Sequence, residues 1–217
     1  MAGDLHYGAL ILAAGESTRM GTDKALLPWP LPVTEADAGV PPTLLAAAIL
    51  ALRPLAREVF IVAGRNAAEL TAVVTACEAR LVVNEAPWRG QFSSLQTGLR
   101  KLVEFGCEAA FITPVDCPPL GGASLGLLRQ GFESAVERGA WAVVPENNGR
   151  HGHPLVASWE LMEAFLAEPE TSNAREVLHA HPHWLKAVSV PERLTKAGLN
   201  TPEEYVAFSV ENTQPIR

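Results

Sequence analysis

The segment from Leu10 to Leu27, with the sequence LILAAGESTRMGTDKALL, constrains the fold of this chain more than any other. An apolar run enters it from Tyr7, as is typical of a buried parallel strand, and small residues follow. Gly15 and Gly21 can adopt positive φ, so consecutive backbone N–H groups can converge on phosphate oxygens. We therefore predict a strand that leads into an anion-binding loop.

Two cations strengthen this prediction. Arg19 offers a forked donor that suits phosphate, and Lys24 offers a compact positive charge. The spacing matches neither the P-loop pattern GxxxxGK[ST] nor the dinucleotide-binding pattern GxGxxG. The alternative is a surface turn with two solvated cations, but the preceding strand and the two cations together favour a phosphate-binding loop.

The rest of the chain alternates apolar runs with helical patterns, and polar residues follow several of the runs. This order predicts an α/β fold: a Rossmann-like three-layer sandwich with a mostly parallel mixed sheet, in which ligands bind at the carboxyl ends of the strands. Helices are expected after Thr43, at about 67–77, from Ser93 or Ser94, at about 123–138 and after Thr201. Strands are expected at Tyr7–Ala13, Glu58–Ala63, Leu81–Val83, Ala109–Val115, Trp141–Val144, from about Pro154, and at Leu185–Val190.

The composition limits the class of protein. A length of 217 residues suits one domain that spans residues 1–217, and 48% hydrophobic residues can form a large core. The net charge of −7 argues against nucleic acid as a partner, because no domain-wide basic field exists. No apolar stretch approaches the ~20 residues that cross a bilayer, and the start of the chain lacks the pattern of a signal peptide. The three cysteines match no zinc pattern and are expected to be reduced thiols in a cytoplasmic protein without a membrane partner.

Residues 28–42, PWPLPVTEADAGVPP, hold five prolines and show neither a helical nor a strand period. We interpret this segment as a loop insertion. Its position after the phosphate loop allows a lid, but a passive surface excursion is favoured, because loops tolerate added length at low cost.

Asp116 follows the strand 109–115 and precedes two prolines that fix the backbone. An aspartate after a strand is often only a turn residue. Here it is expected at the same sheet edge as Arg19 and Lys24, where a carboxylate next to a triphosphate is the ligand that Mg²⁺ requires.

Other polar residues have structural and functional interpretations. Ser93 and Ser94 can cap a helix, or one of them can also contact a nucleotide. His151 and His153 lie two residues apart but have no third ligand at zinc spacing, so His153 is better explained as a substrate-facing or loop-fixing residue. The alternating histidines at 179, 181 and 183 flank Pro182 and are expected on the solvated surface.

Several motifs together resemble the MobA-like nucleotidyltransferases, a group that includes molybdenum cofactor guanylyltransferases and cytidylyltransferases. The first motif, LAAGESTRMGTDKALLP, is highly specific and the aspartate motif moderately so. The motifs follow the family order over almost the whole chain; after the first they are GQFSSLQTGL (90–99), ITPVDCPPL (112–120), HGHPLVAS (151–158), NAREVL (173–178) and GLNTPEEY (198–205).

The resemblance implies roles for individual residues. The chain departs from the family pattern at Asn173, which replaces a glycine, and at Gly198, where several members have an acid. The resemblance implies nucleotide contacts for Leu12, Ala13, Ala14, Gly15, Asn84, Gly90, Ser94 and Leu95, acceptor contacts for His153 and Arg175, and metal ligation by Asp116 and Asn200.

The cations, the loop and the carboxylate favour direct in-line transfer, because no serine or cysteine has a recognisable activating base. The resemblance implies transfer of a nucleoside monophosphate from an NTP to a phosphorylated acceptor with Mg²⁺. CTP and molybdopterin are favoured, since the LAAG of this chain is similar to the cytidylyl branch and guanylyl enzymes tend to have two glycines at Ala14 and Gly15. A sugar phosphate or phosphoalcohol acceptor remains an alternative, and a non-catalytic carrier that delivers a cofactor to an apo-molybdoenzyme is an alternative of another class.

Overall fold

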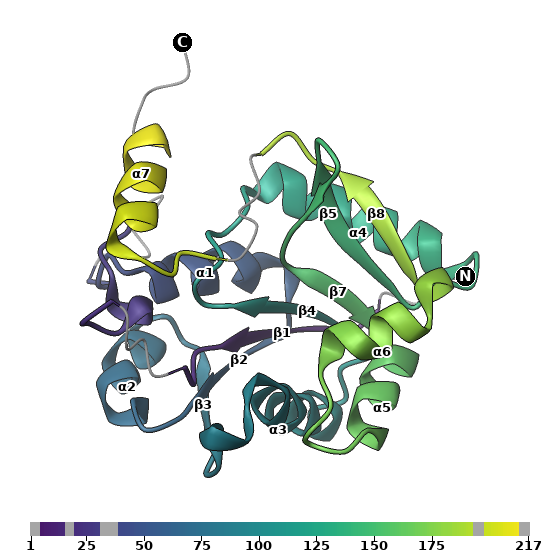
Figure 1. Ribbon diagram of the computed structural model, residues 1–217, viewed down its shortest axis with the longest axis horizontal. Helices are drawn as coiled ribbons and strands as arrows, with labels where there is room; N and C mark the ends of the chain where they lie inside the picture. The colour runs from purple at the N-terminus through teal and green to yellow at the C-terminus, as the bar shows by residue number, and fades with distance from the viewer. Residues whose placement is uncertain (1–4, 16–19, 31–38, 193–197, 213–217) are drawn as a thin grey trace.

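A computed structural model describes residues 5–15, 20–30, 39–192 and 198–212, with side chains up to residue 208. An eight-stranded sheet runs through the described chain in the order β3-β2-β1-β4-β7-β5-β6, and β8 also pairs with β5 (Figure 1). The neighbours β3, β2, β1 and β4 are parallel, whereas β7 is antiparallel to both β4 and β5. The strands are β1 (Tyr7–Leu12), β2 (Glu58–Ala63), β3 (Arg80–Val83), β4 (Ala109–Pro114), β5 (Ala142–Asn147), β6 (Arg150–His151), β7 (Leu155–Ser158) and β8 (Leu185–Ser189).

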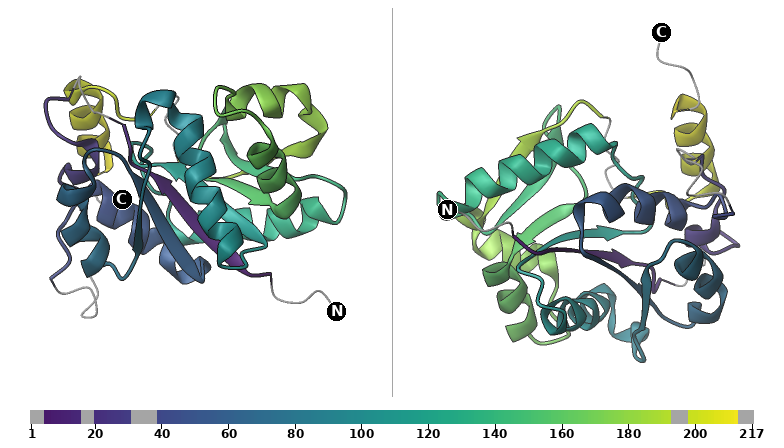
Figure 2. Two further views of the ribbon diagram at one scale, coloured as in Figure 1. Left: turned by 90° about the horizontal axis from the view of Figure 1, so that it is seen from below. Right: turned by 180° about the vertical axis from the view of Figure 1, so that it is seen from behind.

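Helices cover both faces of this sheet. Side chains from α1, α2 and α4 pack with Ile11 and Ile61 on one face, and those from α3, α5 and α6 pack with Leu10 and Val62 on the other. Figure 2 shows the resulting three layers from two further directions. The predicted three-layer α/β fold with a mixed sheet is therefore confirmed. The helices are α1 (Leu44–Leu52), α2 (Ala67–Ala76), α3 (Gln91–Glu104), α4 (Gly122–Val136), α5 (Trp159–Ala167), α6 (Ala174–Ala180) and α7 (Pro202–Asn212).

The helix starts show which local signals determined the structure. Thr43 caps α1 by accepting the N–H of Ala46 at 3.2 Å, as expected. Thr201 caps α7 in the same way by accepting the N–H of Glu204 at 3.2 Å. The prediction that a serine caps α3 is wrong. Gly90 is the cap residue, with φ of 99°, so α3 begins two residues before Ser93.

Most strand boundaries differ from the prediction by one residue or more, and the structure explains two of these differences. β3 begins at Arg80, whose guanidinium pairs with Glu58 on the neighbouring β2. β5 runs from Ala142 to Asn147 because β8 pairs with it along Ala142–Glu146, which extends its ladder beyond the apolar run. Helix α5 was not predicted at all, because it follows β7 directly without a turn signal.

The two ends of the proline-rich segment 28–42 meet. Pro28 and Thr43 form an antiparallel bridge, and the N–H of Trp29 donates to the carbonyl of Pro42 at 2.9 Å. Trp29 also stacks on Phe208 of α7, with ring centroids 5.9 Å apart. Residues 31–38 lie outside the described part of the chain, so the insertion remains a prediction.

None of the described helices has both the length and the apolar character needed to cross a membrane.

Candidate active site

A cavity of about 280 Å³ opens at the carboxyl ends of β1 and β4. The small residues after β1 form one wall and the start of α3 forms another, as expected for a parallel sheet. Six of the eight residues predicted to contact a nucleotide line it: Leu12, Ala13, Ala14, Gly15, Gly90 and Ser94. The remaining lining residues are Asp23, Lys24, Pro87, Gln91, Pro114, Val115 and Asp116.

The side chain of Asn66 holds the start of the loop after β1, a role that was not predicted from the sequence. Asn66 donates to the carbonyl of Ala13 at 2.9 Å and to the carboxylate of Asp23, while its own oxygen accepts the N–H of Gly64 at 3.0 Å. Asp23 in turn accepts the N–H of Ala25 at 2.9 Å. These contacts tie the phosphate loop to the end of β2.

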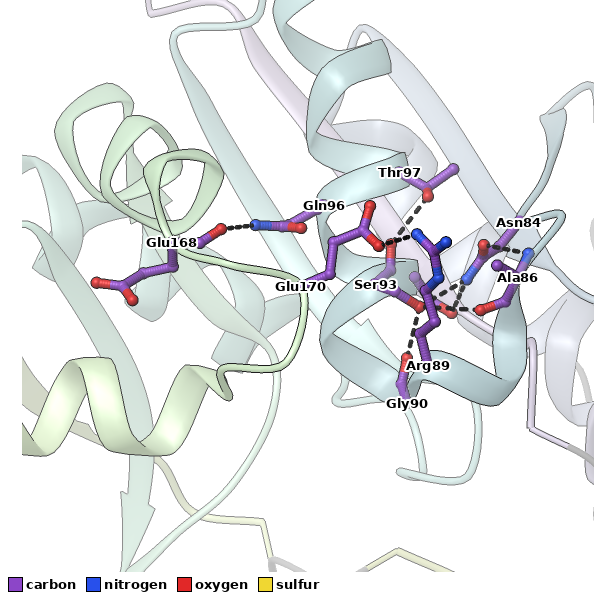
Figure 3. Close-up of polar contacts among 10 residues, drawn as sticks. Asn84, Ala86, Arg89, Gly90, Ser93, Gln96, Thr97, Glu168 and Glu170 are labelled. Carbon is purple, nitrogen blue, oxygen red and sulfur yellow. Dashed lines mark hydrogen bonds and ion pairs between the residues drawn. The ribbon is translucent and has the colours of Figure 1, made fainter.

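Asn84 fixes the first turn of α3. It is buried at the end of β3 and donates to Ser93 Oγ at 3.0 Å and Ser94 Oγ at 2.9 Å, and it accepts the N–H of Ala86 at 3.0 Å (Figure 3). The predicted nucleotide contact of Asn84 would therefore act through Ser94, since the amide is already used within the protein.

A second, larger cavity of about 720 Å³ adjoins the first. Its walls come from β4, α3, the segment before β7, α6 and the turn before α7, and both cavities share Leu12, Gln91, Pro114 and Asp116. The predicted acceptor residues His153 and Arg175 both lie on it, as do Leu95 and Asn200. Most residues predicted to contact the nucleotide thus line the smaller cavity, whereas Leu95 and both predicted acceptor residues lie on the larger one. Their roles in binding remain predictions.

Lys24, Asp116 and Asn200 meet at the junction of the two cavities. The Lys24 ammonium donates to Asp116 Oδ2 at 2.9 Å and to Asn200 Oδ1 at 2.7 Å. The side chains of Lys24 and Asp116 are only 13% and 22% exposed, so bulk solvent screens this pair weakly. Three residues from distant parts of the chain therefore form one polar cluster.

Arg19, which was predicted to contact phosphate together with Lys24, lies outside the described residues. Its role remains a prediction.

His153 lines the larger cavity. Its ring bonds to the backbone of Ile112 and its Nδ1 is buried without a hydrogen-bond partner. Burial lowers the pKa of His153 below the ordinary histidine value, despite the opposing hydrogen bond to Ile112 and the charge of Asp116. A lowered pKa favours the neutral ring of His153 at pH 7. Its bond to Ile112 is compatible with the predicted loop-fixing role and its place on the cavity with the substrate-facing one, so both remain predictions.

The thiol next to the polar cluster is inert. Burial raises the pKa of Cys117 to about 12, and the neighbouring Asp116 carboxylate adds to this effect. The described cysteines are all buried and free, as expected for reduced thiols. This agrees with the exclusion of a cysteine nucleophile.

The three alternating histidines do not form a metal site. His181 stacks on Trp184 with centroids 3.6 Å apart, while His179 and His183 are exposed. The prediction of solvated histidines therefore holds for two of them, but His181 belongs to an aromatic stack. Among the described residues, no three histidine, cysteine, aspartate or glutamate side chains are grouped as metal ligands would be.

Helix α3 connects the walls of the two cavities. Gln96 donates to the carbonyls of Phe165 at 2.8 Å and Glu168 at 2.7 Å, and Arg89 pairs with Glu170 (Figure 3). Both contacts hold the segment between α5 and α6, which ends at the cap residue Asn173. No signal in the sequence predicts these two contacts, because they join residues from separate motifs.

Comparison with known proteins identifies the same family as the sequence motifs. The family model of the MobA-like NTP transferase domain matches residues 9–185. A probable molybdenum cofactor guanylyltransferase of Mycolicibacterium paratuberculosis is 31% identical over 213 residues, which cover 96% of this chain and 98% of the relative. The molybdenum cofactor cytidylyltransferase of Escherichia coli is 23% identical over 206 residues, which cover 94% of this chain and 96% of the relative.

Among solved structures, the crystal structure of Rv0371c from Mycobacterium tuberculosis superposes with a TM-score of 0.76 at 21% identity, covering 96% of this chain and 99% of the other. That likeness supports the fold. Because the family model and a relative above 30% identity both cover most of the chain, this protein belongs to the MobA-like NTP transferase family and is a nucleotidyltransferase.

Proposed function

We propose that the protein transfers a nucleoside monophosphate from an NTP to the phosphate of a molybdopterin-type acceptor and releases pyrophosphate. The observation that carries this proposal is the position of Asp116, which lines both cavities and contacts Lys24 between them. A transferase needs two substrates to meet at one charged site, and a carrier does not. The smaller cavity would hold the triphosphate end of the NTP and the larger one the acceptor.

The residues at the junction fit a divalent cation. Asp116 Oδ2 and Asn200 Oδ1 both accept a hydrogen bond from the same Lys24 ammonium, so two oxygens already converge on one positive charge. Such hard oxygen ligands suit Mg²⁺, which typically uses one or two protein groups together with substrate phosphates. When bound there, Mg²⁺ would supply neutralisation of the phosphate charge.

The protein groups would then act by positioning and charge. An oxygen of the acceptor phosphate attacks the α-phosphorus in line, a new P–O bond forms, and the bond from the α-phosphorus to the bridging oxygen breaks. Lys24 would stabilise the negative charge that accumulates on the leaving pyrophosphate. The backbone after β1, held by Asn66, would orient the triphosphate.

We propose CTP as the preferred nucleotide. Ala14 lines the smaller cavity, and its methyl group would restrict the space for a purine if the base or ribose of the NTP lies against it. GTP is the second candidate, because the relative at 31% identity is named as a guanylyltransferase. A sugar phosphate or phosphoalcohol would use the same chemistry if the larger cavity accepts it.

Two measurements test the proposal. A thermal-shift panel of the four NTPs with Mg²⁺ should favour CTP, and a nucleotide at 100 times its Kd should stabilise the protein by about 2.7 kcal/mol. Pyrophosphate release from CTP should require both Mg²⁺ and molybdopterin. Asp116→Asn should lower turnover by at least ~10²-fold while the protein stays folded. Nucleotide binding without any pyrophosphate release would favour a carrier that supplies an apo-molybdoenzyme.

A further inference from the structure

Gly198 lies directly against the carboxylate of Asp116. Its φ is +72°, and a Cβ added to it would lie 2.7 Å from Asp116 Cγ, 2.8 Å from Oδ1 and 3.0 Å from the carbonyl oxygen. Such short contacts require movement of one of the two groups. Asp116 therefore occupies the space that a side chain at position 198 would need.

Two neighbouring residues hold Gly198 in this place. The N–H of Leu199 donates to the carbonyl of Asp116 at 2.7 Å, and Asn200 accepts from Lys24 at 2.7 Å. Lys24 contacts the opposite oxygen of the carboxylate, Oδ2, at 2.9 Å. Asp116 is thus enclosed by Gly198 on the Oδ1 side and by Lys24 on the Oδ2 side.

We infer that Gly198 is a positioning residue for the carboxylate of Asp116. Without a side chain, the 198–200 turn packs against Asp116 and fixes the direction in which its two oxygens point. Several members of the family have an acidic residue at the position of Gly198. With the backbone placed as it is here, an acidic side chain at this position would displace the carboxylate of Asp116. The oxygen ligands that this chain offers at the site are those of Asp116 and Asn200. The inference rests on the proposed role of Asp116 as a metal ligand.

A competing explanation is that glycine is needed here only because of the positive φ. A non-glycine residue at positive φ is strained wherever it occurs. The chain contains a matched control for this effect. Gly106, after α3, has φ of +69°, and an added Cβ would find no atom within 4 Å. Alanine at 106 and at 198 should therefore share the backbone strain, while only alanine at 198 meets a carboxylate.

The experiment compares Gly198→Ala with Gly106→Ala in thermal unfolding and in Mn²⁺ binding. Water proton relaxation of Mn²⁺ with CTP measures binding of the metal–nucleotide complex to the folded protein. Both variants should lose thermal stability through the shared backbone strain, and Gly198→Ala should lose at least as much as Gly106→Ala because it also meets Asp116. Only Gly198→Ala should weaken Mn²⁺–CTP binding, by at least ~10-fold, the effect of losing a ligand-orienting contact at a metal site.

A double-mutant cycle tests whether the effect acts through Asp116. In an Asp116→Asn background, Gly198→Ala should cause no further loss of Mn²⁺–CTP binding. If Gly198→Ala does not fold, Gly198→Asn with Gly106→Asn as its control replaces the pair, because asparagine tolerates positive φ better and carries the same Cβ.

Wild-type Mn²⁺–CTP affinity in the folded Gly198 variant, or an equal loss in the Gly106 variant, would overturn the inference. If Asp116→Asn alone leaves Mn²⁺–CTP binding unchanged, the metal assignment to Asp116 fails instead, and the inference fails with it. Pyrophosphate release then reports separately on whether transfer occurs.

Discussion

Lys24 Nζ lies 2.9 Å from Asp116 Oδ2, and this contact joins the loop after β1 to the end of β4. The two residues come from separate motifs, and their side chains are mostly buried. In the proposed reaction, Lys24 would supply the positive charge for the leaving pyrophosphate and Asp116 a carboxylate for the metal. Its position between two cavities makes Lys24 the first residue to test.

Lys24→Ala should lower kcat by about 10²-fold and weaken CTP binding by much less, because its charge matters most as the leaving group develops negative charge. Single-turnover kinetics and equilibrium titration with CTP measure the two effects separately. Lys101→Ala, which removes an exposed lysine paired with Glu104, is the control for loss of one positive charge. Equal losses in binding and in transition-state stabilisation would make Lys24 a general phosphate binder.

Ala14→Gly should admit GTP better and reduce the preference for CTP by ~1–3 kcal/mol, the range for one methyl-sized group in a pocket. The reason is that Ala14 lines the smaller cavity. Competition between CTP and GTP, followed by pyrophosphate release, gives the ratio for the wild type and the variant. An unchanged ratio, or a wild-type preference for GTP, would remove the support for CTP and leave nucleotidyl transfer as such intact.

Asn84→Ala should destabilise the protein by about 1–3 kcal/mol, because it leaves two buried serine hydroxyls and the N–H of Ala86 without their partner. It should also weaken CTP binding, since Ser94 lines the smaller cavity. Urea unfolding and CTP titration measure the two effects. Thr71→Ala removes an exposed helix hydroxyl and should change neither quantity by more than about 0.5 kcal/mol. A stable Asn84→Ala protein with normal CTP affinity would contradict this account.

The buried neutral His153 predicts a pH dependence of stability. Because its pKa is lowered in the folded protein, the unfolded chain binds the proton more readily than the folded one. The contribution of His153 to the free energy of unfolding is therefore fully present above pH ~6.5 and is lost as the pH falls below it. Urea unfolding between pH 5 and 8 should show a shallower acid loss in His153→Gln than in the wild type. Thr71→Ala, which removes no titratable group, should leave the profile as it is.

Local signals in the sequence predicted those parts of the site that lie within one strand and the turn after it. The apolar run before Ala13 and the run before Asp116 both form central strands, so their carboxyl ends meet as expected. The contacts of Asn66 and Asn84 were not predictable in the same way. Each joins side chains from different elements, and no periodicity or spacing encodes such a contact.

Some local rules were overridden by tertiary contacts. Ser93 is a good capping residue, yet its hydroxyl accepts from Asn84, and Gly90 starts the helix instead. His181 has a polar ring, yet it stacks on Trp184. In both cases the side chain contacts a residue outside its own helix, which the local sequence does not reveal.

The closed base of the proline-rich segment has a practical consequence. Pro28 pairs with Thr43, and Trp29 bonds to Pro42. These contacts fix the distance between the two ends of the segment, whatever the length of the residues that join them. For a connection of this kind, doubling its length costs only about 0.6 kcal/mol of closure entropy. The segment between Trp29 and Gly39 is therefore a suitable place to insert a short affinity tag or a fluorophore-binding peptide.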